Sequence, residues 1–207
     1  MLVGSEVMVF AVVALVFGLT PGPDVMLVIR HSAVRGVWDG VAVSLGAVTG
    51  GVTWGVAATL GLAAVVQQSP AVYEVIKLGG AVYLVFLGVR NILRARASAA
   101  EGPEIAGSAA SRAAAFRSGL ITDLLNPKVG VFYLALLPQF IPVGADVLGW
   151  SVLLVSVEQL TAISCLVGYA VLAHGVGKLL NRPAVTTWLE RILGTVLIGL
   201  GMRIAVG

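Results

Sequence analysis

The chain alternates long apolar runs with short polar stretches, and the runs are long enough to cross a lipid bilayer. About 18 or more apolar residues in a row span roughly 30 Å of hydrocarbon as a helix. The pattern predicts six transmembrane helices, at about Ser5–Ile29, Gly40–Val66, Val72–Leu93, Gly119–Phe140, Val147–Ala173 and Val185–Ile204. The predicted fold class is therefore an all-α integral membrane protein.

Prolines interrupt the first and fourth predicted helices at matching places. The two interrupting sequences are Thr20-Pro21-Gly22-Pro23-Asp24 and Asn126-Pro127-Lys128. Proline lacks a backbone donor and clashes with the preceding turn, so both helices are expected to break there. Thr20 and Asn126 each read as an N-cap residue, followed by proline at the first position of a restarted helix. The alternative is a simple kink, because prolines are frequent in membrane helices.

A polar segment divides the chain into two halves. Residues 95–115 are built of Ala, Ser, Gly, charged residues and one Pro, which predicts a flexible linker. It separates a first unit, residues 1–94, from a second unit, residues 116–207, with three predicted helices in each. An odd number of helices per half predicts two inverted repeats, an arrangement common in secondary transporters. Leu87-Gly88-Val89-Arg90 also resembles Leu200-Gly201-Met202-Arg203.

Composition supports a membrane location, and the charges predict an orientation. The chain is 58% hydrophobic and 11% charged, against about 25% charged for an average soluble domain. Its mean hydropathy is +1.01. Most of the thirteen basic residues lie between helices one and two, three and four, or five and six. This bias predicts that the linker 95–115 is cytoplasmic and both termini are outside. No basic stripe with interleaved aromatics suggests nucleic-acid binding.

Four ionisable residues fall inside the predicted helices: Asp24, Asp123, Lys128 and Glu158. A charge within the bilayer is costly, so such residues usually face a cavity or each other. Asp24 and Lys128 follow the two breaks and are expected to pair across the halves. Glu158 is expected to bind an ammonium group or to carry a proton. The alternatives are that Asp24 only stabilises a helix start and that Asp123 lies near the cytoplasmic surface.

The restarted helices also predict a solute site. Each restart is expected to leave free N–H groups and a positive dipole end in the membrane, which suit a carboxylate. The candidate substrate-binding residues are Thr20, Pro21, Gly22, Pro23, Asp24, Asn126, Pro127, Lys128 and Trp54; the candidates for proton coupling are Glu158, Asp24 and Asp123. Glycines of the second helix, Gly46 and Gly50 among them, are expected to allow close helix packing.

Other chemistries lack their motifs. No Gly-x-x-x-x-Gly-Lys-Ser/Thr phosphate loop occurs, so ATP-driven transport by this chain is not expected. Cys165, His31 and His174 are too few and scattered for a soft-metal site, and no Ser–His–Asp spacing suggests a hydrolase. We therefore expect neither an enzyme nor a cofactor or metal site, and we expect an ion or solute gradient to drive transport.

Several motifs together resemble the LysE/RhtB family of bacterial amino-acid exporters, and its RhtB homoserine/threonine branch in particular. The matching segments are Leu19-Thr20-Pro21-Gly22-Pro23-Asp24, Ile76-Lys77-Leu78-Gly79-Gly80-Ala81-Val82-Tyr83-Leu84-Val85-Phe86-Leu87-Gly88, Phe116-Arg117-Ser118-Gly119, Leu124-Leu125-Asn126-Pro127-Lys128 and Leu137-Pro138-Gln139-Phe140. The resemblance extends over nearly the whole chain. It implies six helices in the bacterial inner membrane and efflux of amino acids or close derivatives, coupled to protons.

The chain departs from that family pattern at two places. Many relatives carry an acidic residue seven positions before the tyrosine of the fifth helix. Here the tyrosine is Tyr169 and that position is Ala162, with Glu158 one turn earlier. Relatives often have a polar residue near Gly51 to Trp54, where this chain has Gly51-Val52-Thr53-Trp54. The resemblance therefore does not imply which substrate is exported.

Two other functions remain open from the sequence. One is a membrane scaffold that assembles partners through its glycine faces, and the other is metal-ion efflux. The expected partners of the transporter are an amino acid, protons and membrane lipid, with no nucleic acid; a homodimer is a further expectation.

Overall fold

The structure, a computed structural model, describes residues 2–68, 111–142, 144–173 and 183–206. Between these ranges it describes only residues 75, 78, 79, 82, 83, 85, 86, 88, 89, 92 and 93. The described elements are all helices joined by turns. They confirm the predicted all-α class, whereas most of the predicted third helix and residues 95–110 of the predicted linker lie outside the described residues.

The first predicted helix is broken into two, as expected. Helix α1 (Leu2–Leu19) and helix α2 (Pro23–Arg35) meet at an angle of 54°. The backbone N–H of Thr20 donates to the Val16 carbonyl at 3.1 Å, and its hydroxyl donates to the same carbonyl at 2.7 Å. Thr20 therefore closes the end of α1.

The expected N-cap at Thr20 is wrong. Helix α2 has Gly22 as its N-cap, in an extended conformation, and Pro23 at its first position. A proline disfavours helical geometry in the residue before it. With prolines at positions 21 and 23, the helix restarts only at the second.

The fourth predicted helix is also broken. Helix α5 (Arg112–Leu124) is followed by helix α6 (Pro127–Val131), a π-helix η1 (Phe132–Leu136) and a 3₁₀-helix η2 (Leu137–Phe140). The two sides of the break are bent by 52°. Here the prediction is confirmed, because Asn126 is the N-cap of α6 and its side chain accepts a hydrogen bond from the Lys128 N–H.

Helix α5 begins earlier than the sequence suggested. Residues 112–115 were expected in the flexible linker, but they form its first turn. The side chain of Ser111 accepts a hydrogen bond from the Ala114 N–H, and an N-cap of this kind stabilises a helix start. Ala115 is already buried, so the packed part of the chain reaches into the predicted linker.

Three long helices complete the described fold: α3 (Val37–Gln68), α7 (Val147–Val171) and α9 (Pro183–Val206). They agree with the second, fifth and sixth predicted segments to within a few residues. By length and hydropathy, α7 and the Val37–Gly61 part of α3 each suffice to cross a membrane, and each bent pair suffices if it forms one span.

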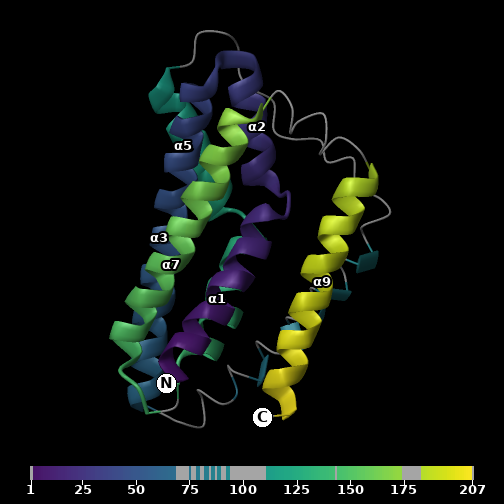
Figure 1. Ribbon diagram of the computed structural model, residues 1–207. Coiled ribbons are helices and arrows are strands. Elements are labelled where there is room, and N and C mark those ends of the chain that lie inside the picture. The colour runs from purple at the N-terminus through teal and green to yellow at the C-terminus, as the bar shows by residue number, and fades with distance from the viewer. Residues whose placement is uncertain are drawn as a thin grey trace.

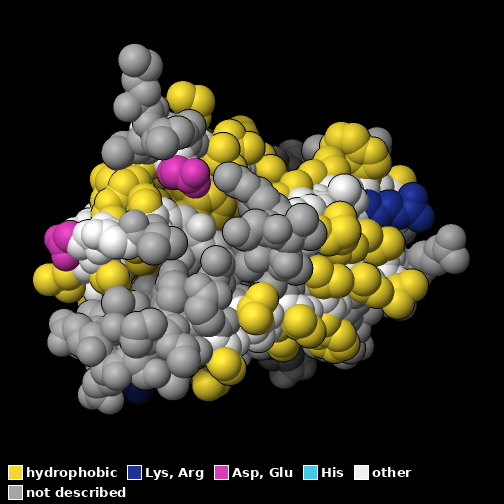
Figure 2. All heavy atoms as spheres, turned by 90° about the horizontal axis from the view of Figure 1, so that it is seen from below, with side chains coloured by type: hydrophobic (Ala, Val, Ile, Leu, Met, Phe, Trp, Pro, Cys, Tyr) yellow, Lys and Arg dark blue, Asp and Glu magenta, His cyan; other side chains and the backbone are white. Residues whose placement is uncertain are grey.

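The helices pack around the first broken pair. Helix α3 packs against both α5 and α7, α1 and α2 pack against α7, and α9 contacts α1 (Figure 1). Both termini lie at the same end of the molecule (Figure 1). Seen from that end, hydrophobic side chains make up much of the described surface (Figure 2).

Glycines bring α3 and α5 into backbone contact, as the sequence predicted. A Cβ atom at Gly46 of α3 would clash with the Phe116 carbonyl of α5, and one at Gly119 would clash with the Val43 carbonyl. Lipid cannot drive helices together by the hydrophobic effect, so close contact of this kind stabilises a membrane bundle.

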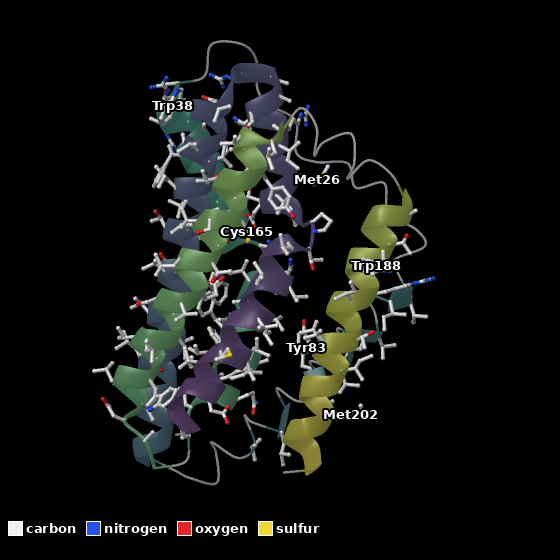
Figure 3. The ribbon with its side chains drawn as sticks, in the orientation of Figure 1. Met26, Trp38, Tyr83, Cys165, Trp188 and Met202 are labelled. Atoms are coloured by element: carbon white, nitrogen blue, oxygen red, sulfur yellow. The ribbon has the colours of Figure 1, made fainter. Side chains whose placement is uncertain are left out.

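A second glycine contact joins the predicted third helix to α9. A Cβ at Gly88 would lie 2.5 Å from the Gly194 carbonyl, and one at Gly194 would lie 2.6 Å from the Gly88 carbonyl. Figure 3 labels Tyr83 of this region together with Trp188 and Met202 of α9. The inverted-repeat relation between the halves stays a prediction.

Candidate functional site: a cavity at the two helix breaks

A cavity of about 60 Å³ lies where the two broken helices meet. Seventeen residues line it, from α1, α2, α3, α5, α6 and α7 and from the two breaks between helices. Its polar wall consists of Thr20, Asp24, Asp123, Asn126, Lys128, Glu158 and Gln159; its apolar wall includes Phe17, Val25, Ala47, Val48, Val129, Ala162 and Leu166. The cavity has room for a few waters.

The two breaks are joined by a hydrogen bond between side chains 102 residues apart. The Asn126 side-chain amide donates to Asp24 Oδ2 at 2.6 Å. The carbonyl oxygen of the same side chain accepts from the Lys128 N–H at 3.0 Å. Asn126 therefore caps its own helix and holds the carboxylate of the other break. The prediction that the breaks lie together is confirmed.

Lys128 reaches from the second break to the first. Its Nζ donates to the Phe17 carbonyl at 2.9 Å and to the Thr20 carbonyl at 3.0 Å. It also lies 4.1 Å from the centroid of the Phe17 ring. The last carbonyls of a helix lack partners within it and carry negative dipole charge. A lysine at this position compensates for the broken end of α1, a role that the sequence did not predict.

Glu158 is part of a buried hydrogen-bonded group. The Tyr133 hydroxyl donates to Glu158 Oε2, and Gln159 Nε2 donates to the same oxygen at 2.7 Å. Gln159 Nε2 also donates to the Tyr133 hydroxyl oxygen at 2.6 Å. Tyr133 lies in the π-helix η1, and π-helical turns often occur at functional sites.

Acidic groups exceed basic ones around the cavity. Asp24, Asp123 and Glu158 line it, and Lys128 is the basic residue among its lining residues. Glu158 and Asp123 are each only 6% exposed. Charge is costly inside a membrane unless it is compensated. If all four groups are ionised, the cavity holds two more negative charges than positive ones, which favours binding of a cation or of protons.

The structure brings together most of the candidate residues, but not all. Trp54 does not line the cavity: its ring packs against α6, where a Cβ at Gly130 would lie 3.1 Å from it, and it belongs to the apolar core. The sequence could not reveal which face of α3 Trp54 occupies. Pro21 and Pro23 form the break without lining the cavity, and the side chain of Pro127 lies outside the described residues.

The expected free N–H groups at the second restart are not there. The Lys128 N–H bonds the Asn126 side chain, and the N–H groups of Val129 and Gly130 bond the Asn126 carbonyl. The N–H groups at the start of α6 are thus hydrogen-bonded to Asn126 of the break itself. At the first restart Pro23 has no N–H, and the Met26 N–H donates to the Gly22 carbonyl.

Sequence reasoning missed Tyr133 and Gln159. A polar Gln159 beside Glu158 was a visible signal, but nothing in the sequence showed that Tyr133 faces them. It also missed a second buried polar group, in which Asp39 Oδ2 contacts His31 Nδ1 at 2.8 Å and Arg35 Nε at 3.4 Å. This group joins α2 to α3 and does not line the cavity.

Residues 15–207 match the family model described as LysE type translocator. The chain belongs to this family. The resemblance seen in the motifs is thereby confirmed. LysE type translocators are transport proteins, so the chain is a transporter rather than an enzyme, and with its apolar helices it is a multi-pass membrane protein.

Three curated proteins illustrate the relationship of this LysE type translocator to others. It is 32% identical to an uncharacterized membrane protein of Vibrio cholerae, over 95% of this chain and 94% of that protein. It is 27% identical to the leucine efflux protein of Salmonella typhimurium, over 95% and 92% of the two chains. It is 26% identical to the threonine efflux protein of the same organism, over 95% of each chain. No solved structure matches the chain.

Proposed function

We propose that this translocator exports amino acids or close derivatives across the bacterial inner membrane by exchange for protons. This proposal has two kinds of support. Relatives that match 95% of the chain are named leucine and threonine efflux proteins. The cavity also offers charges of both signs, as a zwitterion requires, on residues of both helix breaks.

The observation that carries the proposal is the excess of acidic groups in a buried cavity within the membrane. A buried carboxylate is most stable when a proton or another cation neutralises it. If Asp24, Asp123 and Glu158 bind either protons or the ammonium group of a solute, each disfavours the other. Two ligands that compete for one set of groups are negatively coupled, and such competition is the basis of exchange.

Within this proposal, Glu158 carries the exchanged proton. Its carboxylate is held by Tyr133 and Gln159 and lines the cavity, so it can respond to a solute without leaving its partners. Thr20, Gly22, Asp24, Asn126 and Lys128 form the substrate wall, and the prolines set the shape of the breaks. Asp123 contributes to the same acidic wall.

The topology of the proposed exporter follows the charge distribution. Both termini lie outside, the segment 95–115 is cytoplasmic, and the halves 1–94 and 116–207 are inverted repeats of three helices each. Exchange between two faces of the membrane then needs the two breaks to change their mutual position. The chain is expected to act as a homodimer.

The experiment is efflux from proteoliposomes. Vesicles that contain the full chain are loaded with a panel of labelled amino acids, and efflux of each is measured with and without an acidic outside medium. We expect efflux of at least one amino acid, faster when protons can enter in exchange. Glu158→Gln and Asp24→Asn are expected to abolish efflux while remaining in the membrane.

A matched control is Asp146→Asn. Asp146 is exposed at the start of α7, and asparagine is an equally good N-cap, so efflux should be unchanged. Wild-type efflux by both cavity variants would remove the assigned roles. Absence of efflux for every amino acid in the panel would remove the proposed function and would favour the scaffold, for which Asp24, Lys128 and Glu158 are replaceable.

A further inference from the structure

We propose that Asp24, Asp123 and Gln159 form a subsite that binds the primary ammonium group of the solute. The inference rests on the proposed function for its transport readout. It differs from the assignment of Glu158, because Glu158 Oε2 already accepts hydrogen bonds from Tyr133 and Gln159. The structure supplies a different set of acceptors.

Three buried oxygen atoms around the cavity have no hydrogen-bond partner among the described residues. They are Asp24 Oδ1, Asp123 Oδ2 and Gln159 Oε1, from α2, α5 and α7, and all three residues line the cavity. Asp123 is 6% and Gln159 is 8% exposed. Buried polar atoms nearly always have a partner, and leaving one without a partner is costly. Three such acceptors in one cavity indicate that a donor belongs there.

The partners of each side chain leave the unpaired oxygen directed away from them. Asn126 holds Asp24 by Oδ2, which leaves Oδ1. The Gln159 amide nitrogen donates to Glu158 and Tyr133, which leaves Oε1. While Glu158 is ionised this orientation of the amide is required, because the opposite one would place its oxygen against the carboxylate. Two of the three acceptors, Asp24 Oδ1 and Gln159 Oε1, are thus fixed by the surrounding hydrogen bonds.

Two consecutive glycines of α3 make room for this arrangement. A Cβ at Gly50 would lie 2.6 Å from Asp123 Oδ2, and one at Gly51 would clash with the Gln159 amide. Side chains from α5 and α7 therefore lie directly against the α3 backbone. A larger residue at either position would displace an acceptor without changing any charge.

A primary ammonium group matches this set. It has three donors and one positive charge, and the cavity has three unpaired acceptors and an excess of acidic groups. Lys128 shares the cavity, but its Nζ is directed to the Phe17 and Thr20 carbonyls. No group of three or more His, Cys, Asp or Glu residues in the described part of the chain could hold a metal ion.

The other wall of the cavity defines the rest of the solute. Val25, Ala47, Val48 and Leu166 are apolar and line the same space. A small aliphatic body attached to the ammonium group would contact them. The inferred ligand class is therefore a primary amine with a small apolar side chain, of which an aliphatic amino acid is the natural member.

The test is competition for exchange of labelled L-leucine in proteoliposomes, in a potassium medium without sodium. Unlabelled L-leucine, its amide, its 2-hydroxy acid analogue and its N,N,N-trimethyl derivative are the competitors. Only the first two carry a primary ammonium group. Wild type should bind them at least about tenfold more tightly than the other two, since a hydrogen bond to a charged group contributes a factor of this order.

Two variants test the residues. Asp123→Asn should weaken competition by leucine about 10- to 100-fold and remove the preference over the trimethyl derivative. Gly50→Ala should do the same without a change in charge, whereas Gly61→Ala should not, because a Cβ there meets nothing within 4 Å. The ratio between competitors does not depend on how much protein is folded.

The proposal is overturned if wild type binds the trimethyl derivative as well as leucine, or if Asp123→Asn keeps the wild-type preference. Should no amino acid be exchanged, the proposed function fails and the subsite is tested separately in detergent. L-Leucinamide should then raise the unfolding temperature of wild type but not of Asp123→Asn. If sodium raises the unfolding temperature of wild type and L-leucinamide does not, the subsite is contradicted. The subsite is also contradicted if neither of them raises it.

Discussion

The side-chain amide of Asn126 donates a hydrogen bond to the carboxylate of Asp24 at 2.6 Å and so ties the second helix break to the first. The same side chain caps α6. A single asparagine thereby couples a local helix start to the contact between the two halves of the chain. Any movement that separates the two breaks must break this hydrogen bond. A movement that keeps the bond must carry both breaks together.

We expect Asn126→Ala to lose efflux and about 1 kcal/mol of stability, the usual cost of removing an N-cap. Efflux should fall further than stability explains, because Asp24 loses its donor. Ser111→Ala removes the N-cap of α5, at an exposed position that does not line the cavity. It should lose similar stability in thermal unfolding and keep its efflux. Equal efflux in the two variants would contradict a role for Asn126 beyond capping.

Lys128→Met should reduce efflux at least about tenfold. The change leaves the Phe17 and Thr20 carbonyls without the donor that Nζ provides, and removing the donor to a buried acceptor is costly. It also increases the negative charge of the cavity. Arg117→Met, at an exposed position of α5, removes a positive charge from the same half and should have no such effect. The measurement is the initial rate of efflux per mole of reconstituted protein.

Tyr133→Phe should reduce efflux about tenfold through Glu158. Its hydroxyl is a donor to the carboxylate and an acceptor for Gln159, and a hydrogen bond to a charged group contributes about 1.5–3 kcal/mol. Tyr83→Phe makes the same chemical change at a tyrosine that is 38% exposed, and its efflux should match that of wild type. If Tyr133→Phe also matches wild type, the hydroxyl does not support proton exchange.

Gly46→Ala should destabilise the bundle by about 3 kcal/mol or more, because its methyl group would clash with the backbone of α5 and overpacking has costs of this order. Gly61→Ala, on the same helix, meets no neighbour. It should be neutral or stabilising by up to about 1 kcal/mol, since alanine favours a helix over glycine. Thermal unfolding in detergent distinguishes them. An unchanged unfolding temperature for Gly46→Ala would contradict the close contact of α3 and α5.

The helix breaks could be read from the sequence because proline acts locally. Asn126 and Pro127 stand alone, and their roles as N-cap and first helical residue were correct. The first break has two prolines: the sequence predicts Pro21 as the first helical residue, whereas Pro23 begins the helix. A residue that precedes either proline is kept from helical geometry, so the later proline decides where the helix restarts.

The contents of the cavity were only partly predictable. Buried charges in a membrane segment are conspicuous, and Asp24, Asp123, Lys128 and Glu158 all line the cavity. Tyr133 was missed because nothing in the local sequence shows that it lies in a π-helical turn and contacts Glu158. Trp54 does not line the cavity, and an apolar helix with neighbours on several sides gives no periodic signal for the face that does.

The most direct test of the account is whether an exported solute occupies the cavity. In a Cys165→Ala background, Ala162→Cys places a thiol on the cavity wall, and Asp146→Cys places one at an exposed helix start. The rate of modification by a small methanethiosulfonate is measured with and without an exported amino acid. The account predicts several-fold slower modification of Ala162→Cys and no change for Asp146→Cys. Equal rates at Ala162→Cys, in a variant that still exports the amino acid, would contradict it.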